Sequence, residues 1–391
     1  MPLRLHRINL TQFRGYEAAR IDLHIYKDSS VVVLTGENGS GKTNILEAVS
    51  LLTPGKGLRG ADLSDLRNKA AGHGESWGIA AEVETPGGLM ARIGTGPNTS
   101  SGREDKRRLV RIDGRDVKSQ SALAGIISAV WLTPQMDRLF LEGPSARRKF
   151  LDRLVFAYDP GHTTRVGRYD KNLRERLKLL QIERGADPKW LDALESQISQ
   201  DAVAIAAARL FLVRRLQEHA DETGLTASLF PRPLLSVTGS VEAAMMKNPA
   251  LAVEDSFKEK LLMNREADRA AGRTLDGTHR SDLAVTYGAK DMPAAQCSTG
   301  EQKALLVSIV LAHARMMRAE KGFVPLILLD EVAAHLDDRR RAQLFEHLLP
   351  LEAQVWLTGT EAAVFYPLKK AARFFDVRPG LVTERALPEA V

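Results

Sequence analysis

The stretch "VVVLTGENGSGKTNILEAV", Val31 to Val49, joins a run of β-branched apolar residues to a glycine-rich turn and then to an apolar pattern with helical spacing. The turn matches G-x-x-x-x-G-K-[ST], and a position between a predicted strand and a predicted helix is the context in which that pattern binds phosphate. A glycine-rich surface turn is the alternative reading. The predicted phosphate-binding residues are Gly36, Glu37, Asn38, Gly39, Ser40, Gly41, Lys42 and Thr43.

Each residue type in this turn has a chemical reason to be there. Glycines allow the backbone angles that turn successive N–H groups toward a phosphate, and the positive end of the following helix adds to the attraction. Lys42 would bridge the terminal phosphates of a nucleotide, and the Thr43 hydroxyl would coordinate Mg²⁺. The pattern therefore predicts ATP and Mg²⁺ as cofactors.

A second apolar run, "PLILLDE" from Pro325 to Glu331, ends in two carboxylates. It is short and continuous, as expected of a central parallel strand that is covered on both faces. Asp330 would hold Mg²⁺ through water, and Glu331 would orient or deprotonate the attacking water. A strand followed by an ordinary acidic loop is the alternative. We predict catalytic roles for Glu331, Lys42 and Asp330.

Two further motifs flank the acidic strand. "STGEQ", beginning at Ser298, precedes a long amphipathic helical pattern upstream of the strand, and "AAHLD", residues 333–337, follows it. This order resembles the ABC-type ATPases, whose signature motif precedes the acidic strand and whose D-loop follows it. The resemblance implies that Ser298 and Gly300 meet the terminal phosphate held by the P-loop of a second chain. Ser-Thr-x-Glu is also a helix N-cap pattern, so a purely structural role stays open.

Composition limits the class of protein. The chain has 391 residues, of which 44% are hydrophobic and 27% charged, as in ordinary globular proteins. We find no run of 18 apolar residues and no signal segment, and therefore expect a cytoplasmic protein without a membrane partner. The single cysteine, Cys297, excludes an internal disulfide. A net charge of +6 favours contact with polyanions.

The spacing of the motifs separates two kinds of ABC ATPase. From Thr43 to Ser298 the chain runs 255 residues, more than the helical insert of a transporter subunit, and Thr358 and Thr360 stand where a transporter's histidine would be sought. A large insertion instead resembles the chromosome-maintenance and repair branch. The helical patterns at 171–184 and 190–220 are too short for a long coiled coil and predict a short arm.

These observations predict an α/β fold. We expect an ABC-type P-loop ATPase head of two lobes, split by a mainly helical arm. The predicted boundaries are 1–135 for the N-terminal lobe, 136–272 for the arm and 273–391 for the C-terminal lobe. Within the N-terminal lobe, residues 77–94 and 107–117 have the pattern of hairpin strands joined by Gly-containing turns.

Four segments, in order, resemble the RecF family of bacterial recombination-mediator ATPases: "NLTQFRGYE" (9–17), "GENGSGKTNILEA" (36–48), "TPQMDRLFLEGPSARRKFLD" (133–152) and "GTHRSDL" (277–283). The third is the most diagnostic, since it matches the family at Pro134, Gly143, Pro144, Arg147, Arg148, Phe150, Leu151 and Asp152. Departures from the family pattern occur at Gln135, Glu142, Thr278 and Ser281. We assign no catalytic role to Gln135 or Ser281.

The resemblance implies an ATP-dependent homodimer of ABC heads that binds DNA at gaps or junctions between duplex and single strand. It also implies cooperation with RecR and RecO in loading RecA. In this hypothesis ATP closes the dimer on DNA, and slow hydrolysis directed by Glu331 opens it. A transporter ATPase with a membrane partner, and a mainly structural DNA clamp indifferent to nucleotide, are the alternatives.

Basic residues are the candidates for DNA contact, through phosphates that carry no sequence information. A solvated surface is the alternative for each of them. Arg147 and Arg148 lie at the start of the arm, where a salt bridge competes with a DNA role. Arg14 would either reach the nucleotide or pack inside its lobe. The remaining candidates are Lys56, Arg59, Arg103, Lys106, Arg107, Arg108, Arg111 and Arg115.

Overall fold

The computed structural model describes residues 2–23, 30–72, 74–98, 108–182, 187–222, 229–333 and 336–385. The chain forms two compact units. Unit 1 comprises Met1–Asp137, Leu225–Phe230 and Leu306–Val391, and unit 2 comprises Arg138–Gly224 and Pro231–Leu305. The long helix α8 (Thr299–Lys321) contributes residues to both units.

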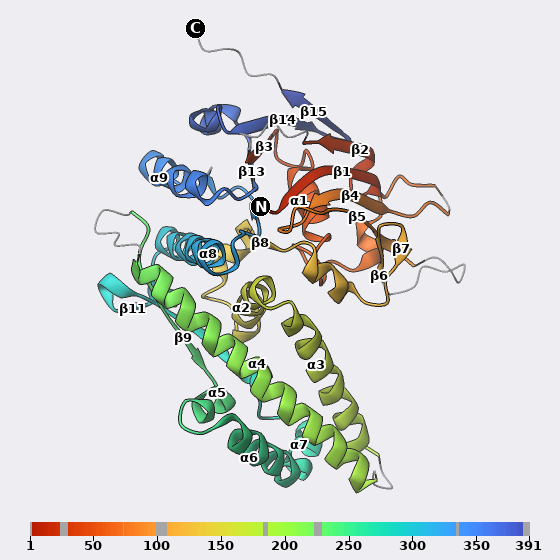
Figure 1. The fold of residues 1–391 in the computed structure, drawn as a ribbon, viewed down its shortest axis with the longest axis vertical. Helices are drawn as coiled ribbons and strands as arrows, with labels where there is room; N and C mark the ends of the chain where they lie inside the picture. Colours follow the sequence, from red (N-terminus) through yellow and green to blue (C-terminus); the bar gives the residue numbers. More distant parts are fainter. Residues whose placement is uncertain are drawn as a thin grey trace. The chain divides into compact units, whose positions relative to one another are not determined.

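The P-loop strand lies in the middle of a six-stranded sheet of unit 1, in the order β15-β14-β3-β13-β12-β8 (Figure 1). All neighbours in this sheet are parallel except β14 and β15. Every residue of β3, β8, β12 and β13 is buried, which is why these strands are continuous apolar runs. The bounds are β3 Val31–Thr35, β8 Ala129–Leu132, β12 Leu326–Leu329, β13 Val355–Gly359, β14 Ala372–Arg378 and β15 Leu381–Arg385.

A second six-stranded sheet of unit 1 is antiparallel, in the order β2-β1-β4-β5-β6-β7. Its strands alternate buried and exposed positions, as expected of a sheet with one wet face. The predicted hairpin strands are confirmed, because β4 pairs antiparallel with β5 and β6 with β7. The bounds are β1 Arg4–Phe13, β2 Tyr16–Asp22, β4 Gly78–Glu84, β5 Met90–Pro97, β6 Arg108–Ile112 and β7 Arg115–Asp116.

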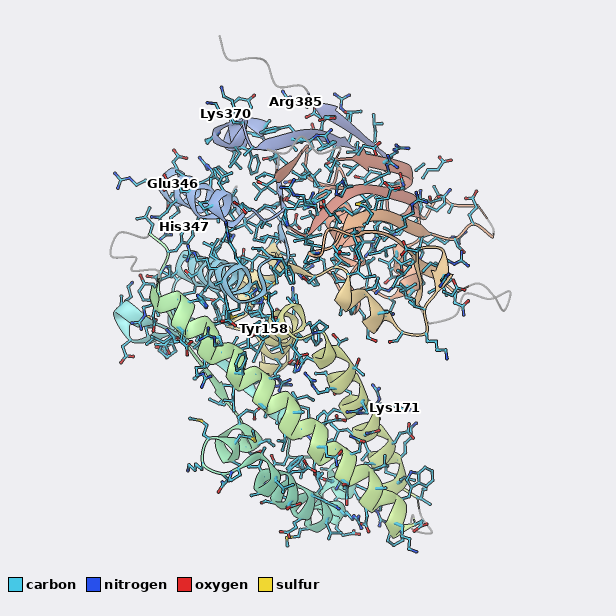
Figure 2. The ribbon with its side chains drawn as sticks, in the orientation of Figure 1. Tyr158, Lys171, Glu346, His347, Lys370 and Arg385 are labelled. Atoms are coloured by element: carbon cyan, nitrogen blue, oxygen red, sulfur yellow. The ribbon has the colours of Figure 1, made fainter. Side chains whose placement is uncertain are left out.

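Helix α1 (Lys42–Ser50) joins the two sheets of unit 1 into one core. Ile45 and Leu46 of α1 belong to the same buried cluster as Ile8 of β1 and Trp356 of β13. Helix α9 (Asp338–Leu348) also belongs to unit 1 and carries Glu346 and His347 (Figure 2). The P-loop helix is therefore fixed along its buried face by apolar packing, and its first turn is left to face a ligand.

Unit 2 is mainly helical. The long helix α4 (Pro188–Glu222) packs beside α3 (Gly161–Leu180) (Figure 1). Both begin earlier than the sequence pattern indicated, and α3 does so without an N-cap hydrogen bond from a side chain. The other elements are α2 Pro144–Tyr158, α5 Ser240–Met245, α6 Ala250–Met263, α7 Arg265–Ala271, and the antiparallel strands β9 Pro233–Thr238, β10 Asp282–Tyr287 and β11 Met292–Pro293.

Short 3₁₀ turns complete both units. They are η1 Leu63–Leu66, η2 Gln120–Gly125, η3 Pro134–Arg138, η4 Thr278–Arg280, η5 Gly288–Lys290, η6 Ala294–Gln296, η8 Leu349–Leu351 and η9 Ala362–Leu368. Within the described ranges, no helix combines the length and the apolar character needed to cross a bilayer.

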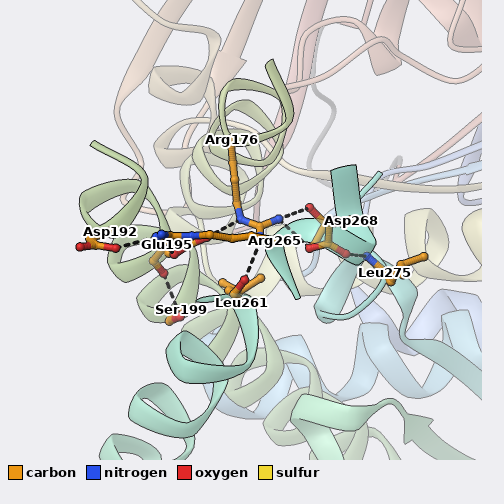
Figure 3. Close-up of polar contacts among 9 residues, drawn as sticks. Arg176, Asp192, Glu195, Ser199, Leu261, Arg265, Asp268 and Leu275 are labelled. Carbon is orange, nitrogen blue, oxygen red and sulfur yellow. Dashed lines mark hydrogen bonds and ion pairs between the residues drawn. The ribbon is translucent and has the colours of Figure 1, made fainter. Parts of the chain in front are cut away.

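The core of unit 2 contains a buried ion network (Figure 3). The fully buried guanidinium of Arg176 on α3 donates to Glu195 on α4 at 2.8 Å and to Asp268 on α7 at 2.7 Å. It also donates to the carbonyl oxygen of Leu261 on α6 at 2.7 Å. One side chain thus ties four helices together. Arg265 adds a second cation on Glu195, at 2.6 Å.

The predicted domain boundaries differ from these compact units in three places: unit 1 extends to Asp137, it includes Leu225–Phe230 of the predicted arm, and the segment after the arm clusters with unit 2. Residues 273–305 were assigned to the C-terminal lobe, whereas they cluster with the arm helices in unit 2. The reason is that β10 pairs with β9, and α2 packs on β10. As a division into functional domains, 1–135, 136–272 and 273–391 stay a prediction.

Candidate functional site

The phosphate-binding turn requires glycine at two positions for steric reasons. At Gly36 a Cβ would lie 2.1 Å from the carbonyl oxygen of Val377, and at Gly41 it would lie 2.4 Å from the Tyr16 hydroxyl. Gly41 also has φ +111° at the N-cap of α1, a conformation that favours glycine. Close packing on both sides therefore holds the turn in one shape between β3 and α1.

Lys42 lies at the first position of α1 and is folded back on the turn. Its Nζ donates to the carbonyl oxygens of Gly36 at 2.7 Å and Glu37 at 2.8 Å. Burial lowers the pKa of Lys42, and the charges of Glu331 and Asp330 partly oppose that shift. A nucleotide phosphate would supply a full negative charge in place of two carbonyl dipoles.

Asp330 and Thr43 meet although 287 residues separate them in sequence. The Thr43 hydroxyl donates to the Asp330 carboxylate at 2.9 Å, and the Thr358 hydroxyl donates to it at 2.8 Å. Burial raises the pKa of Asp330, and these two hydrogen bonds counteract the shift. A hydroxyl and a carboxylate are hard oxygen ligands of the kind Mg²⁺ uses beside phosphates, so the residues fit that ion. The described residues hold no cluster of three or more His, Cys, Asp or Glu that would build an all-protein metal cage.

Glu331 directly follows β12 and has φ +55°, a strained backbone conformation for a residue other than glycine. Its N–H donates to the Thr358 hydroxyl at 2.8 Å. Strain of this kind persists where neighbouring contacts over-determine the backbone, and it clusters at functional sites. The hydrogen bond to Thr358 thus fixes the backbone of Glu331, the predicted catalytic residue, next to Asp330.

Thr358 is the site residue that sequence reasoning missed. We noted it only as the absence of a transporter's histidine, whereas it is fully buried and bonds to both acidic positions at once. A signal was present, since Thr358 lies next to the end of β13, a strand that pairs with β12 in parallel register. The carboxyl ends of adjacent parallel strands meet at one edge of a sheet.

Arg14 contacts α1 rather than open solvent. Its guanidinium pairs in bidentate fashion with the fully buried carboxylate of Glu47, with both N–O distances at 2.8 Å, and donates to the Asp65 carbonyl oxygen at 2.7 Å. Arg59 donates to the same carboxylate at 3.1 Å. This geometry favours the packing alternative for Arg14. Its reach toward a nucleotide stays a prediction.

The signature segment caps α8. The Ser298 N–H donates to the Glu301 carboxylate at 2.9 Å, and the Glu301 N–H donates back to the Ser298 hydroxyl at 3.4 Å, which is a capping box. Hydrogen bonds from Lys290 and Ser298 lower the pKa of Glu301 to about 2. Ser298 and Gly300 lie in unit 2 and the P-loop in unit 1. The N-cap reading is therefore confirmed, and a role toward a second chain's phosphate stays a prediction.

The structure corrects one candidate DNA contact. Arg108 is only 7% exposed, and its guanidinium donates to the carbonyl oxygens of Leu51 and Thr53 and to the Gln120 amide oxygen. Such a buried side chain cannot lie on a flat DNA-binding surface. The run of basic residues suggested a surface position for Arg108. Side chains of β6 alternate between its two faces, however, so Arg108 points inward and Arg111 outward.

The other candidates divide into three groups. Lys56, Arg111 and Arg115 are exposed, with Lys56 near Asp62 and Arg111 paired with Asp116. Arg59 is also exposed, and its guanidinium donates to Glu47 and Asn44. Three candidates lie outside the described residues: Arg103, Lys106 and Arg107.

Two of the segments that resemble the RecF family meet in unit 2. Arg147 on α2 binds both carboxylate oxygens of Asp282 at 2.7 Å, and Arg148 donates to the Ser281 carbonyl oxygen at 2.7 Å. Asp152 on α2 pairs with the buried Arg209 of α4 at 2.8 Å. This is the salt-bridge alternative for Arg147, while Arg148 makes a hydrogen bond to the backbone. Both side chains are used to hold α2 against the segment that begins β10.

The chain is similar to known proteins over nearly its whole length. The family model described as RecF/RecN/SMC N terminal domain matches residues 4–383. A protein of Mesorhizobium japonicum named "DNA replication and repair protein RecF" is 47% identical over 385 residues, covering 98% of each chain. A protein of Caulobacter vibrioides with the same name is 45% identical over 381 residues, covering 95% of each.

Solved structures share the fold. The recombination mediator protein RecF with ATP, described as part of the RecFOR pathway, superposes with a TM-score of 0.84 at 22% identity over 98% of each chain. An Smc head bound to the C-winged helix domain of ScpA superposes with a TM-score of 0.55 at 15% identity, again over 98% of each. The predicted ABC-type head is thereby confirmed as the fold, and the chain belongs to the RecF family within the RecF, RecN and SMC group.

Proposed function

We propose that this chain is an ATP-dependent DNA-binding protein of replication and recombinational repair. The observation that carries the proposal is the bonded set of Thr43, Asp330 and Thr358 at the P-loop. It unites the two halves of a nucleotide site in a chain that is 47% identical to a protein named for DNA replication and repair. ATP is the nucleotide that we assign to residues Gly36 to Thr43.

The residues of the site have separate roles in hydrolysis. Lys42 exchanges its two carbonyl partners for the terminal phosphates. Thr43 and Asp330 would hold Mg²⁺, which would neutralise charge on the phosphates. Glu331 orients the attacking water and accepts its proton, because its backbone is anchored to Thr358 next to the phosphate-binding turn.

A second copy of the chain completes the site. Ser298 and Gly300 begin α8, whose first backbone N–H groups are suited to a γ-phosphate. If these groups come from the partner, ATP is needed for dimerisation and turnover is slow. DNA then binds to the closed dimer and stimulates hydrolysis, and hydrolysis releases it.

The DNA substrate and the protein partners are proposed from the resemblance to the RecF family, one member of which is described as part of the RecFOR pathway. In this proposal the chain acts with RecO and RecR in placing RecA on gapped or junction DNA. The exposed cations Lys56, Arg111 and Arg115 are our candidates for phosphate contact, together with Arg103, Lys106 and Arg107.

The first experiment measures the mass of the protein in solution with Mg²⁺ and no nucleotide, ADP or ATP. We expect dimers only with ATP, a longer-lived dimer for Glu331→Gln, and none for Lys42→Ala. In parallel, the anisotropy of a labelled gapped duplex mixed with the protein should rise when ATP is present, and not with ADP or without nucleotide. A monomer under all conditions would contradict the trans site, and equal DNA binding with and without ATP would favour a structural clamp.

A further inference from the structure

A cavity of about 980 Å³ lies in unit 1 beside the carboxyl end of α1, away from the P-loop. Four stretches of chain line it: the loop after α1, the turn that leads into η1, the end of β5, and the stretch from β6 to η2. None of the nucleotide-binding residues contributes to this wall. The cavity is therefore separate from the ATP site, although both contact the same helix.

Arg108 places an uncompensated positive charge in the wall. Its guanidinium is buried, and its hydrogen-bond partners are the neutral oxygens of Leu51, Thr53 and Gln120. Within the described residues, the buried Arg108 Nε has no hydrogen-bond partner. A buried cation without a counter-charge is costly, and the carbonyl dipoles at the end of α1 offset only part of that cost. Consistent with this, burial lowers the pKa of Arg108 to about 10.

The rim of the cavity is also positive. Lys56 and Lys118 line it with Asp62 as the one carboxylate among the lining residues, and Asp62 lies 3.3 Å from Lys56. Lys118 is exposed and makes no hydrogen bond or ion pair within the described part of the chain. Arg108 and Lys118 are thus left without an acidic partner in the wall.

The remaining wall is mixed, with polar side chains from Ser64, Ser119 and Gln120 and an apolar part. Val110, Val117 and Pro97 face the cavity. The volume falls in the range of ligand sites and exceeds what a single phosphate fills. Two cations beside a partly apolar wall suit a phosphate that carries a sugar, because the phosphate meets the charges and the sugar packs on the side chains.

We propose that this cavity is a second phosphate site, which binds a phosphodiester or phosphate monoester group through Arg108 and Lys118. Two sources share that chemistry: the backbone of DNA and a free phosphorylated molecule. Binding of DNA here rests on the proposed function, whereas binding of a free phosphorylated molecule does not. Arg108 also donates to the carbonyl oxygens of Leu51 and Thr53, directly after α1, so a ligand in this cavity would lie beside the end of the helix whose first turn is proposed to bind ATP.

The first test is thermal unfolding with saturating Mg²⁺–ADP, which keeps added phosphate out of the P-loop. Sodium phosphate is compared with sodium chloride at equal pH and ionic strength, for wild type, Lys118→Gln and the matched control Lys69→Gln. Lys69 is exposed on the same unit and does not line the cavity. We expect phosphate to raise the unfolding midpoint of wild type and control, and Lys118→Gln to weaken the apparent phosphate affinity about tenfold. Arg108→Met, if it folds, should lose the response altogether.

The second test separates the sources by anisotropy of a labelled duplex, again with ADP so that ATP-driven dimerisation plays no part. If DNA fills the cavity, Lys118→Gln weakens DNA binding more than Lys69→Gln does, and phosphate competes beyond the effect of salt. Equal DNA binding by both variants, with the phosphate response still lost in Lys118→Gln, assigns the site to a free phosphorylated molecule. An equal phosphate response in wild type and Lys118→Gln would overturn the site.

Discussion

Thr358→Val tests whether one buried hydroxyl organises the acidic edge of the sheet. Valine keeps the shape of threonine, so no cavity forms, but two hydrogen bonds are lost. The Glu331 N–H would be left without its 2.8 Å acceptor, at a cost of about 1–3 kcal/mol. The Asp330 carboxylate would lose a 2.8 Å donor, worth about 1.5–3 kcal/mol for a charged acceptor, and would keep the donor from Thr43.

We therefore expect Thr358→Val to lower the free energy of unfolding of unit 1 by about 2–4 kcal/mol, as measured by urea titration at pH 7.5. The lost donor also raises the pKa of Asp330 further, since burial already raises it and Thr358 opposes that shift. Nucleotide binding should consequently fail at a higher pH in the variant as the solution is acidified. Thr358→Ser, which keeps the hydroxyl, is the control. Loss of less than about 0.5 kcal/mol, with an unchanged pH profile, would refute the reasoning.

Three other changes have definite expected results. Gly36→Ala should abolish nucleotide binding measured by calorimetry, because its Cβ would lie 2.1 Å from the Val377 carbonyl oxygen. Gly55→Ala is the control: its Cβ would have no neighbour within 4 Å, so the only expected cost is the backbone strain of its positive φ. Arg176→Met should cost unit 2 about 3–5 kcal/mol in urea unfolding, by leaving two buried carboxylates short of their partner, while Mg²⁺–ATP affinity stays as in wild type. Glu301→Gln should lower the thermal unfolding midpoint near neutral pH. Because the pKa of Glu301 in the folded protein is depressed to about 2, the difference in midpoint from wild type should be largest above about pH 4.5 and should shrink as the pH falls toward 2. A difference in midpoint that does not depend on pH would contradict the capping role.

Local patterns explain what the sequence predicted well. The P-loop is one continuous stretch in which strand, glycine turn and helix each have their own signal, and β3 and α1 occupy the expected residues. The same holds for Ser298 and Glu301, whose capping box spans four residues. In such segments, the residues that define the structure are neighbours in the chain, and a pattern records them completely.

Roles that depend on register between distant strands were harder to predict. Thr358 matters only because β13 pairs with β12 so that its last residues lie beside Asp330. Arg108 was assigned to a surface because it continues a basic run, whereas the alternation of β6 turns it toward the end of α1. A one-residue shift in that strand would exchange the buried and exposed arginines, and charge composition contains no information on the shift.

Motif order and chain contacts also place residues 273–305 differently, because the contacts depend on strand pairing. The segment precedes the signature, so motif order placed it with the C-terminal lobe, yet β10 completes a sheet with β9, and its Asp282 receives Arg147 from α2. These contacts cluster residues up to Leu305 with the arm, so Ser298 and Gly300 belong to a different compact unit from Lys42. Because α8 contributes residues to both compact units, the order of motifs along the chain does not tell to which unit the first residues of this helix belong. The pairing of β10 with β9 decides it, and that pairing depends on contacts between segments that are far apart in sequence.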